Sequence, residues 1–412
     1  MDNAARRRDK SAMQHALIIG GGLNGPALAL ALAKAGIGAT LLDALPAETR
    51  SAPGFDGRAY ALAAASVKLL KALGVWEAVA AEAQPIEEIK VTDGVAGEGA
   101  GPFWLHFERG ALEEGPMGQM VEDRHLRPAL LAALEGAGVT QRAGAKVIAQ
   151  ETGPGGARVT LEGGEVLEGT LIVGADGRRS GTAMRAGLKR RGTEYGQIAV
   201  TCAVAHERPH EGVAHQFFMP GGPLAILPLS GNRSSIVWSE RAARAEALMA
   251  MEEEAFLAAL RPAFGSHLGQ ISLASKRFSY PLGLSLAERF VAARLALVGD
   301  AAHGLHPLAG QGLNAGFRDV AALAEVLGAA VRRGEDIGSA PVLARYQSWR
   351  GFDTAALAMA TDGFNRLFSN DNPLLRAGRR LGLGAVSALP GLRRGLMREA
   401  AGLTGDLPPL MR

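Results

Sequence analysis

The 412-residue sequence predicts an α/β fold: a parallel-sheet domain, an inserted and mainly antiparallel β domain, and helices at the C-terminal end. The parallel-sheet domain is indicated by a buried-strand pattern at residues 16–19, an Ala/Leu-rich helix over residues 26–35 and a second strand at residues 40–42. This order opens a βαβ unit, whose two strands run in parallel. Residues 295–298 form another short apolar run of the same kind, so the domain resumes late in the chain.

The inserted domain is indicated by a change of pattern between about Arg185 and Arg289. Short apolar runs separated by turn residues predict strands at residues 198–205, 216–219, 224–229 and 235–238. Helices are expected at residues 63–73 and 126–134 before the insert, and at 312–332 and 342–367 after it. We therefore divide the chain into a disordered lead-in (1–14), a first domain in two pieces (15–185 and 290–370), the insert (186–289) and a C-terminal helical tail (371–412).

Composition and charge exclude several classes of protein. The formal net charge is only +3 and the charges are dispersed, so the long basic stripe that nucleic-acid binding needs is absent. The single cysteine, Cys202, has no partner for an intrachain disulfide or a thiolate metal site, which fits a reducing compartment. We therefore expect a cytoplasmic protein that does not bind nucleic acid.

The apolar run over residues 16–42 resembles a membrane anchor, because Arg6, Arg7 and Arg8 precede it. Three consecutive glycines, Pro26 and Lys34 interrupt the run, whereas a spanning helix needs about 20 uninterrupted apolar residues. We therefore predict no spanning segment and keep a peripheral contact with the inner face of the membrane open.

The first motif is a glycine-rich turn between the first strand and the first helix. Gly20, Gly22 and Gly25 satisfy G-x-G-x-x-G, a pattern that arises about once by chance in a chain with 55 glycines. Its context is more specific, because Asp43 ends the next strand 18 residues after the last glycine. The pattern predicts a Rossmann-like dinucleotide site, with pyrophosphate at the helix N-terminus and ribose at Asp43, and leaves NAD or FAD open. The alternative is an ordinary strand-to-helix turn.

The second motif, Gly174-Ala-Asp176-Gly177, directly follows an apolar strand. It places the Asp176 carboxylate at the carboxyl end of the strand, where open α/β sheets bind ligands. A plain β-turn is the competing interpretation, because Asp and Gly are common turn residues.

The third motif starts at Gly299-Asp300 and runs through Gly310-Gln311-Gly312 into a long helix. Asp300 ends a buried strand, where a carboxylate can bind a polyol, and the helix start would direct its positive dipole towards the ligand. Such a helix N-terminus would stabilise the anionic reduced ring of a flavin. His303 and His306 lack further metal ligands nearby, so no metal site is predicted.

These segments together resemble the flavoprotein aromatic hydroxylases with the p-hydroxybenzoate-hydroxylase-like fold. More narrowly, the sequence is similar to the ubiquinone-biosynthesis hydroxylase family, and the similarity extends over nearly the whole chain from about His15. Four segments carry the narrower resemblance: residues 56–62 (DGRAYAL), 121–124 (VEDR), 306–314 (HPLAGQGLN) and 368–373 (FSNDNP).

The resemblance implies a role for each residue of the three motifs. The glycines of the first motif would hold the pyrophosphate of FAD, and Asp43 its adenosine ribose. Asp176 would lie near the pyrophosphate and the groove where nicotinamide approaches, and Asp300, next to Gly299, would bind the ribitol. The remaining cofactor-binding residues implied are Arg58, Arg124, Pro307, Gly310, Gln311, Gly312 and Asn314, with Pro307 and Gly310 beside the flavin ring.

Two positions depart from the family pattern. The second strand usually ends in Glu, and the shorter Asp43 stands there. The Ser-x-x-Arg that usually follows the Asp-Gly turn is not kept, since Ala183 occupies the arginine position and Arg185 lies two residues later. The roles of Ser180 and Arg185 are therefore open.

The function implied is an FAD-dependent monooxygenase that hydroxylates the aromatic ring of a polyprenylated phenol in ubiquinone biosynthesis. Transiently docked NAD(P)H would reduce the FAD, and O₂ would give a flavin C4a-hydroperoxide that the electron-rich ring attacks. The protein would exclude water and orient the ring, and no side chain is identified as a general base. The strand at residues 224–227 would line the substrate slot or belong to the core.

Three other functions stay open. One is a hydroxylase of the same fold that acts on a small soluble phenol. Another is a flavin-dependent reductase of isoprenoid double bonds, which needs no O₂. The third is a non-catalytic flavoprotein scaffold in a quinone-biosynthesis complex, which would have no need for Asp300 and the 310–312 helix start in ligand-ready form.

The C-terminal tail suggests a partner. Residues 374–403 combine Leu, Val and Met with six arginines, at positions 376, 379, 380, 393, 394 and 398. A basic amphipathic pattern of this kind fits an anionic membrane surface or a quinone-biosynthesis complex. The alternative is a helix that covers the first domain with its arginines in water.

Overall fold

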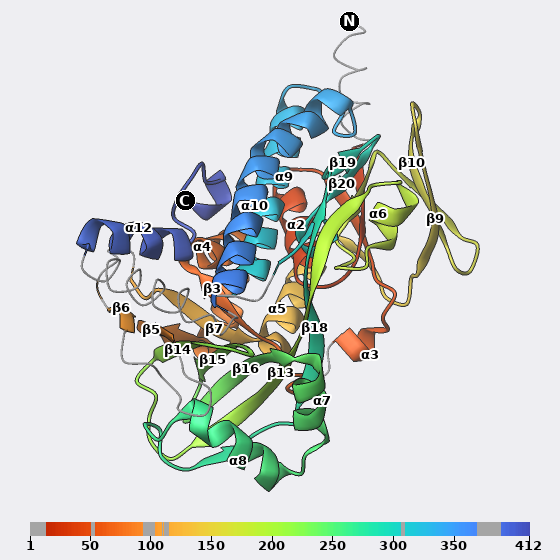
Figure 1. Cartoon of the computed structure of the whole chain (residues 1–412). Coiled ribbons are helices and arrows are strands. Elements are labelled where there is room, and N and C mark those ends of the chain that lie inside the picture. The colour runs from red at the N-terminus through yellow and green to blue at the C-terminus, as the bar shows by residue number, and fades with distance from the viewer. Residues whose placement is uncertain are drawn as a thin grey trace, which may run out of the picture.

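The computed structural model describes residues 14–50, 54–93, 104–108, 110, 115–305, 310–368 and 389–412 (Figure 1). The lead-in over residues 1–13, Pro307, and residues 369–388, which include the start of the tail, lie outside the described residues. Gln14, which the sequence assigned to the lead-in, is held in place. Its amide donates to the carbonyl of Glu335 at 2.8 Å and accepts from the backbone N–H of Ile337 at 3.0 Å.

A six-stranded sheet forms the first domain, in the order β19-β20-β12-β1-β2-β8. All neighbours pair in parallel except β19 and β20. The strands are β1 (His15–Ile19), β2 (Gly38–Leu42), β8 (Thr140–Arg142), β12 (Leu171–Gly174), β19 (Val291–Ala292) and β20 (Leu295–Leu297). Strands on both sides of the inserted segment therefore lie side by side in one sheet, as the sequence predicted for residues 16–19, 40–42 and 295–298.

The register of this sheet aligns the carboxyl ends of four strands. Ile19 is paired with Gly174 on one side and with Leu42 on the other, and Gly174 is also paired with Leu297. The residues that follow these four ends are those of the three sequence motifs. The fold thus brings segments almost 300 positions apart to one edge of the sheet.

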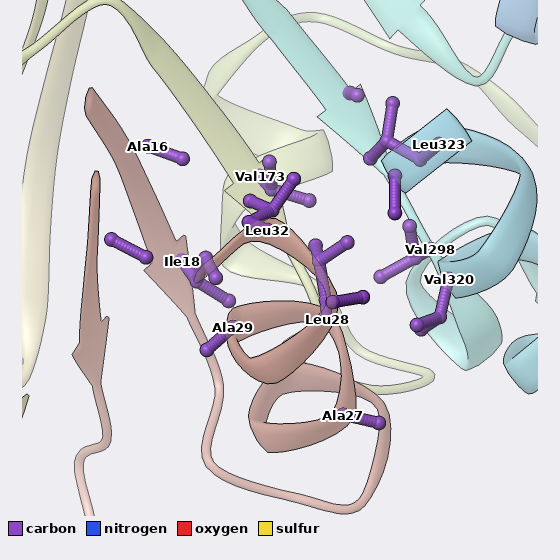
Figure 2. Packing of buried hydrophobic residues seen from close by; sticks show 14 of the residues in the cluster. Ala16, Ile18, Ala27, Leu28, Ala29, Leu32, Val173, Val298, Val320 and Leu323 are labelled. Atoms are coloured by element: carbon purple, nitrogen blue, oxygen red, sulfur yellow. The ribbon is translucent and has the colours of Figure 1, made fainter. Parts of the chain in front are cut away.

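Two helices cover one face of the sheet, α2 (Asn24–Lys34) and α9 (Gln311–Arg332). Figure 2 shows Leu28 and Leu32 of α2 between Val173 of the sheet and Val320 and Leu323 of α9. Small alanine side chains let α2 approach both neighbours closely, which explains its Ala/Leu composition. The helix begins two residues before the predicted start, because Pro26 is tolerated in the first turn.

The other helices of the first domain and the tail are α3 (Ala47–Arg50), α4 (Ala64–Leu73), α5 (Asp123–Gly136), α6 (Gly181–Arg185), α10 (Ala340–Phe368) and α12 (Pro390–Ala400). Short 3₁₀ turns lie at Trp76–Ala78, Ala80–Glu82, Gly299–Ala301 (η3) and Pro409–Met411 (η5). The predicted helices at 63–73, 126–134, 312–332 and 342–367 are all present, with α5 longer at both ends. No described helix is long and apolar enough to cross a bilayer.

A nine-stranded sheet forms the second layer, in the order β21-β18-β13-β16-β15-β14-β5-β6, with β17 paired to β13. Its strands are β5 (Glu88–Asp93), β6 (Trp104–Phe107), β13 (Arg190–His206), β14 (Val213–Met219), β15 (Gly222–Leu229), β16 (Arg233–Arg241), β17 (Ile271–Leu273), β18 (Phe278–Ala287) and β21 (His303–Gly304). All pairings are antiparallel except that of β14 with β5. The sheet therefore also takes strands from outside the predicted insert, at residues 88–93, 104–107 and 303–304.

Helices α7 (Ala242–Ala250) and α8 (Glu253–Phe264), which the sequence analysis missed, cover one face of this sheet (Figure 1). Phe256 and Leu260 of α8 pack with Cys202 and Trp238 in a core that is separate from that of the first domain. Burial raises the pKa of the Cys202 thiol to about 12, so this cysteine is an unreactive core residue.

Two small sheets complete the fold. One has the order β3-β7-β4 and consists of β3 (Ala59–Ala63), β4 (Gln84–Ile86) and β7 (Gly118–Glu122). The other is the ribbon β11-β10-β9, formed by β9 (Val147–Gly153), β10 (Gly156–Leu161) and β11 (Val166–Gly169). The first of these small sheets contacts both β15 and α9, so it connects the second layer to the first.

Candidate functional site

The glycine turn after β1 is closely packed on one side and open on the other. A side chain at Gly20, whose φ is +113°, would come within 2.3 Å of the carbonyl oxygen of Ala175, and one at Gly25 within 1.9 Å of the carbonyl oxygen of Gly20. A Cβ added at Gly22 meets no heavy atom within 4 Å. The start of α2 has no side-chain cap and no acidic residue in its first turn. Its free N–H groups therefore face a space that suits a phosphate.

Asp43, at the end of β2, lies beside this turn and is buried. Its Oδ1 accepts from the backbone N–H of Leu45 at 2.8 Å, and its Oδ2 lies 3.5 Å from Nε of Arg50. Arg50 is buried as well, and its Nε and Nη2 have no hydrogen-bond partner within the described residues. Desolvation lowers the pKa of Arg50. A buried guanidinium with unpaired donors fits an anionic or polar ligand, and sequence reasoning missed it.

Arg58 belongs to a network that the sequence only partly predicted. It donates to Asp56 and lies 3.3 Å from a carboxylate oxygen of Asp123. The same buried carboxylate accepts from Tyr60 at 2.8 Å and from two nitrogens of Arg127 at 2.8 and 2.9 Å. Burial and the Asp123 charge raise the pKa of Tyr60, so its hydroxyl stays protonated and donates.

Arg127 connects this network to the glycine turn, since its Nη1 donates to the carbonyl of Gly21 at 3.4 Å. It was not among the predicted site residues. Arg124 was a predicted site residue. Its side chain is only partly exposed, and its Nε lies 2.9 Å from a carboxylate oxygen of Glu122. Arg233 donates to the other oxygen of Glu122 at 2.7 Å, so the buried carboxylate lies between two arginines.

Asp176 lies next to Gly20, and protein groups already satisfy its carboxylate. Ser180 donates to Oδ1 at 2.5 Å, and both the backbone N–H and the hydroxyl of Thr182 donate to Oδ2 at 2.9 Å. Ser180 also caps α6 by accepting from the N–H of Ala183 at 2.9 Å. Arg185 extends to Gln150 at 3.1 Å. Asp176 therefore fixes the turn beside the glycine motif.

Asp300, after β20, has a different environment. Its side chain is 42% exposed, and Nε of Arg178 lies 3.9 Å from Oδ2, too far for a hydrogen bond. No hydrogen bond to this carboxylate is found among the described residues, so it is available to a ligand. The preceding Gly299 has a φ of +61° and no room for a side chain, because the amide of Asn24 would lie 2.1 Å from its Cβ.

Helix α9 begins beside this carboxylate. Its N-cap, Gly310, has a φ of +65° and packs on Ala61 of β3, whereas a Cβ at Gly312 meets no atom within 4 Å. The first turn has no acidic residue and no side-chain cap. Gln311, the first residue of that turn, has an interaction partner within the protein. The helix start therefore directs its positive dipole, with the backbone N–H groups of its first turn, towards a ligand.

Asn314 joins the start of α9 to β3 and α4. Its Oδ1 accepts from the N–H of Ala63 at 2.9 Å and from Ser66 at 2.7 Å, and its Nδ2 donates to the carbonyls of Ala61 and Gly310 at 2.9 and 3.0 Å. All four hydrogen-bonding positions of its amide, two donors and two acceptor lone pairs, are used in this way. The side chain of Asn314 thus serves to place the helix start.

The described residues contain no group of three His, Cys, Asp or Glu side chains able to hold a metal ion. His303 is fully buried and bonds through Nε2 to Asp319. His306 lies outside the described residues.

Within the part of the chain that the structure describes, this edge has the chemistry of an FAD site. It combines two helix starts without side-chain caps near Gly22 and Gly312, a carboxylate without a hydrogen bond at Asp300, and a buried arginine, Arg50, with donors that have no partner. The FAD binding domain family matches residues 13–357. The chain belongs to this family.

Two relatives that match almost the whole chain are hydroxylases of this family. A ubiquinone hydroxylase, UbiL, of Rhodospirillum rubrum is 46% identical over 96% of this chain and 92% of that protein. A 3-demethoxyubiquinol 3-hydroxylase of Escherichia coli is 39% identical over 94% of this chain and 98% of that protein. The crystal structure of p-nitrophenol 4-monooxygenase PnpA from Pseudomonas putida has the same fold, with a TM-score of 0.77 at 20% identity over 96% of this chain and 99% of that one. The protein is an FAD-dependent monooxygenase, as the family resemblance of its sequence implied.

Proposed function

We propose that this flavoprotein hydroxylates the aromatic ring of a polyprenylated phenol in ubiquinone biosynthesis, with NAD(P)H as a transient reductant and O₂ as the oxidant. The names of the relatives, ubiquinone hydroxylase and 3-demethoxyubiquinol 3-hydroxylase, support the pathway. The single observation that carries the proposal is the Asp300 carboxylate, which has no hydrogen bond from the described residues, beside the start of α9, which has no side-chain cap among them. This pair provides an acceptor for ribitol hydroxyls and a positive dipole for an anionic ring.

FAD, when bound, supplies the redox chemistry of the hydroxylation. The residues of the chain hold and shield it. The glycine turn and the start of α2 would accept the pyrophosphate, and Arg50 with Asp43 would contact the adenosine end. Asp300 would accept hydrogen bonds from the ribitol, and the N–H groups at Gln311 and Gly312 would face the negative edge of the ring.

An apolar cluster between the two layers supports a hydrophobic substrate. It contains Met117 just before β7, Met120 of β7, Leu229 of β15 and Met397 of α12, and it reaches Ala61, which packs on Gly310. Thioether side chains are flexible and adapt to different apolar ligands. We propose that the prenyl chain follows this cluster away from the ring.

The strand over residues 224–227 was predicted either to line the substrate slot or to belong to the core, and its side chains divide between its two faces. Leu224 and Ile226 belong to the core beneath α7 and α8, whereas Leu227 packs on the opposite face, against the methionine cluster. The alternation follows from the period of two in a strand. We propose that Leu227 and Leu229 of β15 are the residues of this strand that line the path of the prenyl chain.

The test compares substrates on the purified, yellow protein. We expect NAD(P)H oxidation to be stimulated by a prenylated phenol, with one atom of ¹⁸O₂ incorporated into its ring. Stimulation by 4-hydroxybenzoate alone would instead assign a small soluble phenol. Prenylated product formed without O₂ would assign a reductase, and an absence of turnover with bound FAD would assign a scaffold.

We also propose that the protein contacts the membrane through its C-terminal region. Arg394 and Arg398 of α12 are exposed, and so are Leu396 of the same helix and Leu389 just before it, a combination that suits anionic lipid. The predicted arginines 376, 379 and 380 lie outside the described residues. Sedimentation with phosphatidylglycerol vesicles should fall at least fivefold when both arginines are changed to Glu, and unchanged sedimentation would contradict this contact.

A further inference from the structure

The backbone turn that carries Asp300 is held by side chains on both of its sides. On one side, Asp319 of α9 accepts from the N–H of Gly299 at 2.9 Å. On the other side, Arg190 donates to the carbonyl of Asp300 at 3.0 Å and also to that of Ala301. The N–H and C=O groups of η3 are thus fixed from opposite directions, while the Asp300 side chain itself has no hydrogen bond among the described residues.

Arg190 also connects this turn to the second layer. It is the first residue of β13, and its guanidinium donates to the hydroxyl of Ser285 at 2.9 Å and to the Ser285 carbonyl at 3.3 Å. Ser285 lies on β18, which pairs with β13 around Arg190 and Ala287. One guanidinium therefore holds the two strands that connect the layers against the turn.

We propose that Arg190 is a positioning residue for FAD, which presents the Asp300 carboxylate to the ribitol by fixing the carbonyls of Asp300 and Ala301. This inference rests on the proposed role of Asp300. A carboxylate on a fixed backbone loses less conformational freedom on binding than one on a loose turn, so the affinity for the ligand rises. The planar fork of arginine suits this task, since one side chain here serves four acceptors on three residues.

The neighbouring Arg191 provides a matched control. It lies on the same strand, is 83% exposed, and binds Glu288 at 2.7 Å on the surface without contacting the turn. Arg190→Gln and Arg191→Gln remove the same charge one residue apart, so a general effect of charge or of strand β13 would appear in both. Arg190→Lys keeps the charge but cannot serve the four acceptors together.

The experiment titrates apo-protein with FAD and follows the quenching of flavin fluorescence. We expect the Kd for FAD to rise at least tenfold in Arg190→Gln and less in Arg190→Lys, and to stay within twofold in Arg191→Gln. The urea midpoint of the apo-protein should differ little between the two Gln variants. A Kd of Arg190→Gln within threefold of the wild type would overturn the proposal.

A merely structural role predicts a different result. The Kd and the urea midpoint would then change together, and Lys would restore neither; this outcome would also overturn the proposal. If Arg190→Gln does not fold, Arg190→Lys decides, and an unchanged Kd in that variant counts against the assignment. Wild-type protein that binds no FAD would refute the proposed function instead.

Discussion

Arg350 of α10 donates through Nε to Oδ1 of Asp319 at 2.8 Å, and the two side chains are 2% and 0% exposed. The second oxygen of Asp319 accepts from His303 and from the N–H of Gly299. Burial opposes the ionisation of Asp319, but His303 and Arg350 outweigh this effect and hold the pKa of Asp319 below its usual value. The ion pair therefore joins α10 to the turn beneath Asp300.

Removal of one partner from this pair should be costly. Arg350→Met leaves the Asp319 charge buried with less compensation, and we expect the free energy of unfolding to fall by about 3–5 kcal/mol. Arg345→Met on the same helix is the control, because Arg345 binds Glu335 at a partly exposed position, where solvent screens the ion pair and its loss should change the stability little. Urea unfolding of both variants measures the difference. Equal losses of unfolding free energy would show that the buried ion pair stabilises the fold no more than the partly exposed one.

Substitutions at two glycines of the turn after β1 should test folding and ligand binding separately. Gly20→Ala forces a side chain into a backbone carbonyl at a positive φ, so we expect poorly folded protein. Gly22→Ala meets no protein atom, so the fold should persist while the added methyl group occupies the approach of the pyrophosphate. FAD titration of Gly22→Ala should show at least a tenfold higher Kd with an unchanged melting temperature. A Gly22→Ala protein that binds FAD normally would place the pyrophosphate elsewhere.

The three motifs were predictable from the sequence because each is local. A strand end followed by glycine or aspartate can be recognised within a few residues, and parallel pairing then brings Gly20, Asp43 and Asp300 to one edge. Arg190 and Arg350 act through partners about 100 and 31 positions away, and an isolated arginine gives no local signal of such contacts. Long-range pairing also determines that β5 joins the second layer.

The helices of the second layer could have been found. Residues 242–250 (AARAEALMA) consist of strong helix formers, and Glu253 and Glu254 stand in the first turn of α8, where acidic residues are favoured. Both were obscured by the strand pattern around them. The completed hydrogen bonds of Asn314 could not have been predicted, because they depend on β3 and α4 packing about 250 residues away in sequence.

Asp300→Ala should separate cofactor affinity from stability. The side chain is partly exposed and its nearest cationic nitrogen, on Arg178, is 3.9 Å away, so its loss should change the free energy of unfolding by about 1 kcal/mol or less. Hydrogen bonds to a charged group contribute about 1.5–3 kcal/mol, which corresponds to a rise of about 10- to 150-fold in the Kd for FAD. Colourless purified protein with a native circular dichroism spectrum is the expected result. A yellow Asp300→Ala protein with wild-type affinity would contradict the role given to this carboxylate.

A group of histidines in the second layer should make the fold sensitive to acid. The ring of His215 on β14 lies 4.6 Å from that of His267, and Lys90 and Glu88 of β5 are the other charged groups that face it. Desolvation, with the charges of His267 and Lys90, lowers the pKa of His215 to about 3, and Glu88 only partly opposes this. Desolvation also lowers the pKa of His267.

The direction of the pH effect follows from the neutral state of the folded ring. Between its unfolded value of 6.5 and about 3, His215 binds a proton only in the unfolded chain, so its contribution is complete above pH 6.5 and is lost as the pH falls. From pH 7.5 to 5.5 the loss for this one group is about 1.4 kcal/mol. Urea unfolding with saturating FAD should show this loss in the wild type and in His125→Gln, a partly exposed histidine on α5. In His215→Gln the loss between the two pH values should be smaller by about that amount, and an identical loss in all three proteins would exclude His215 as its source.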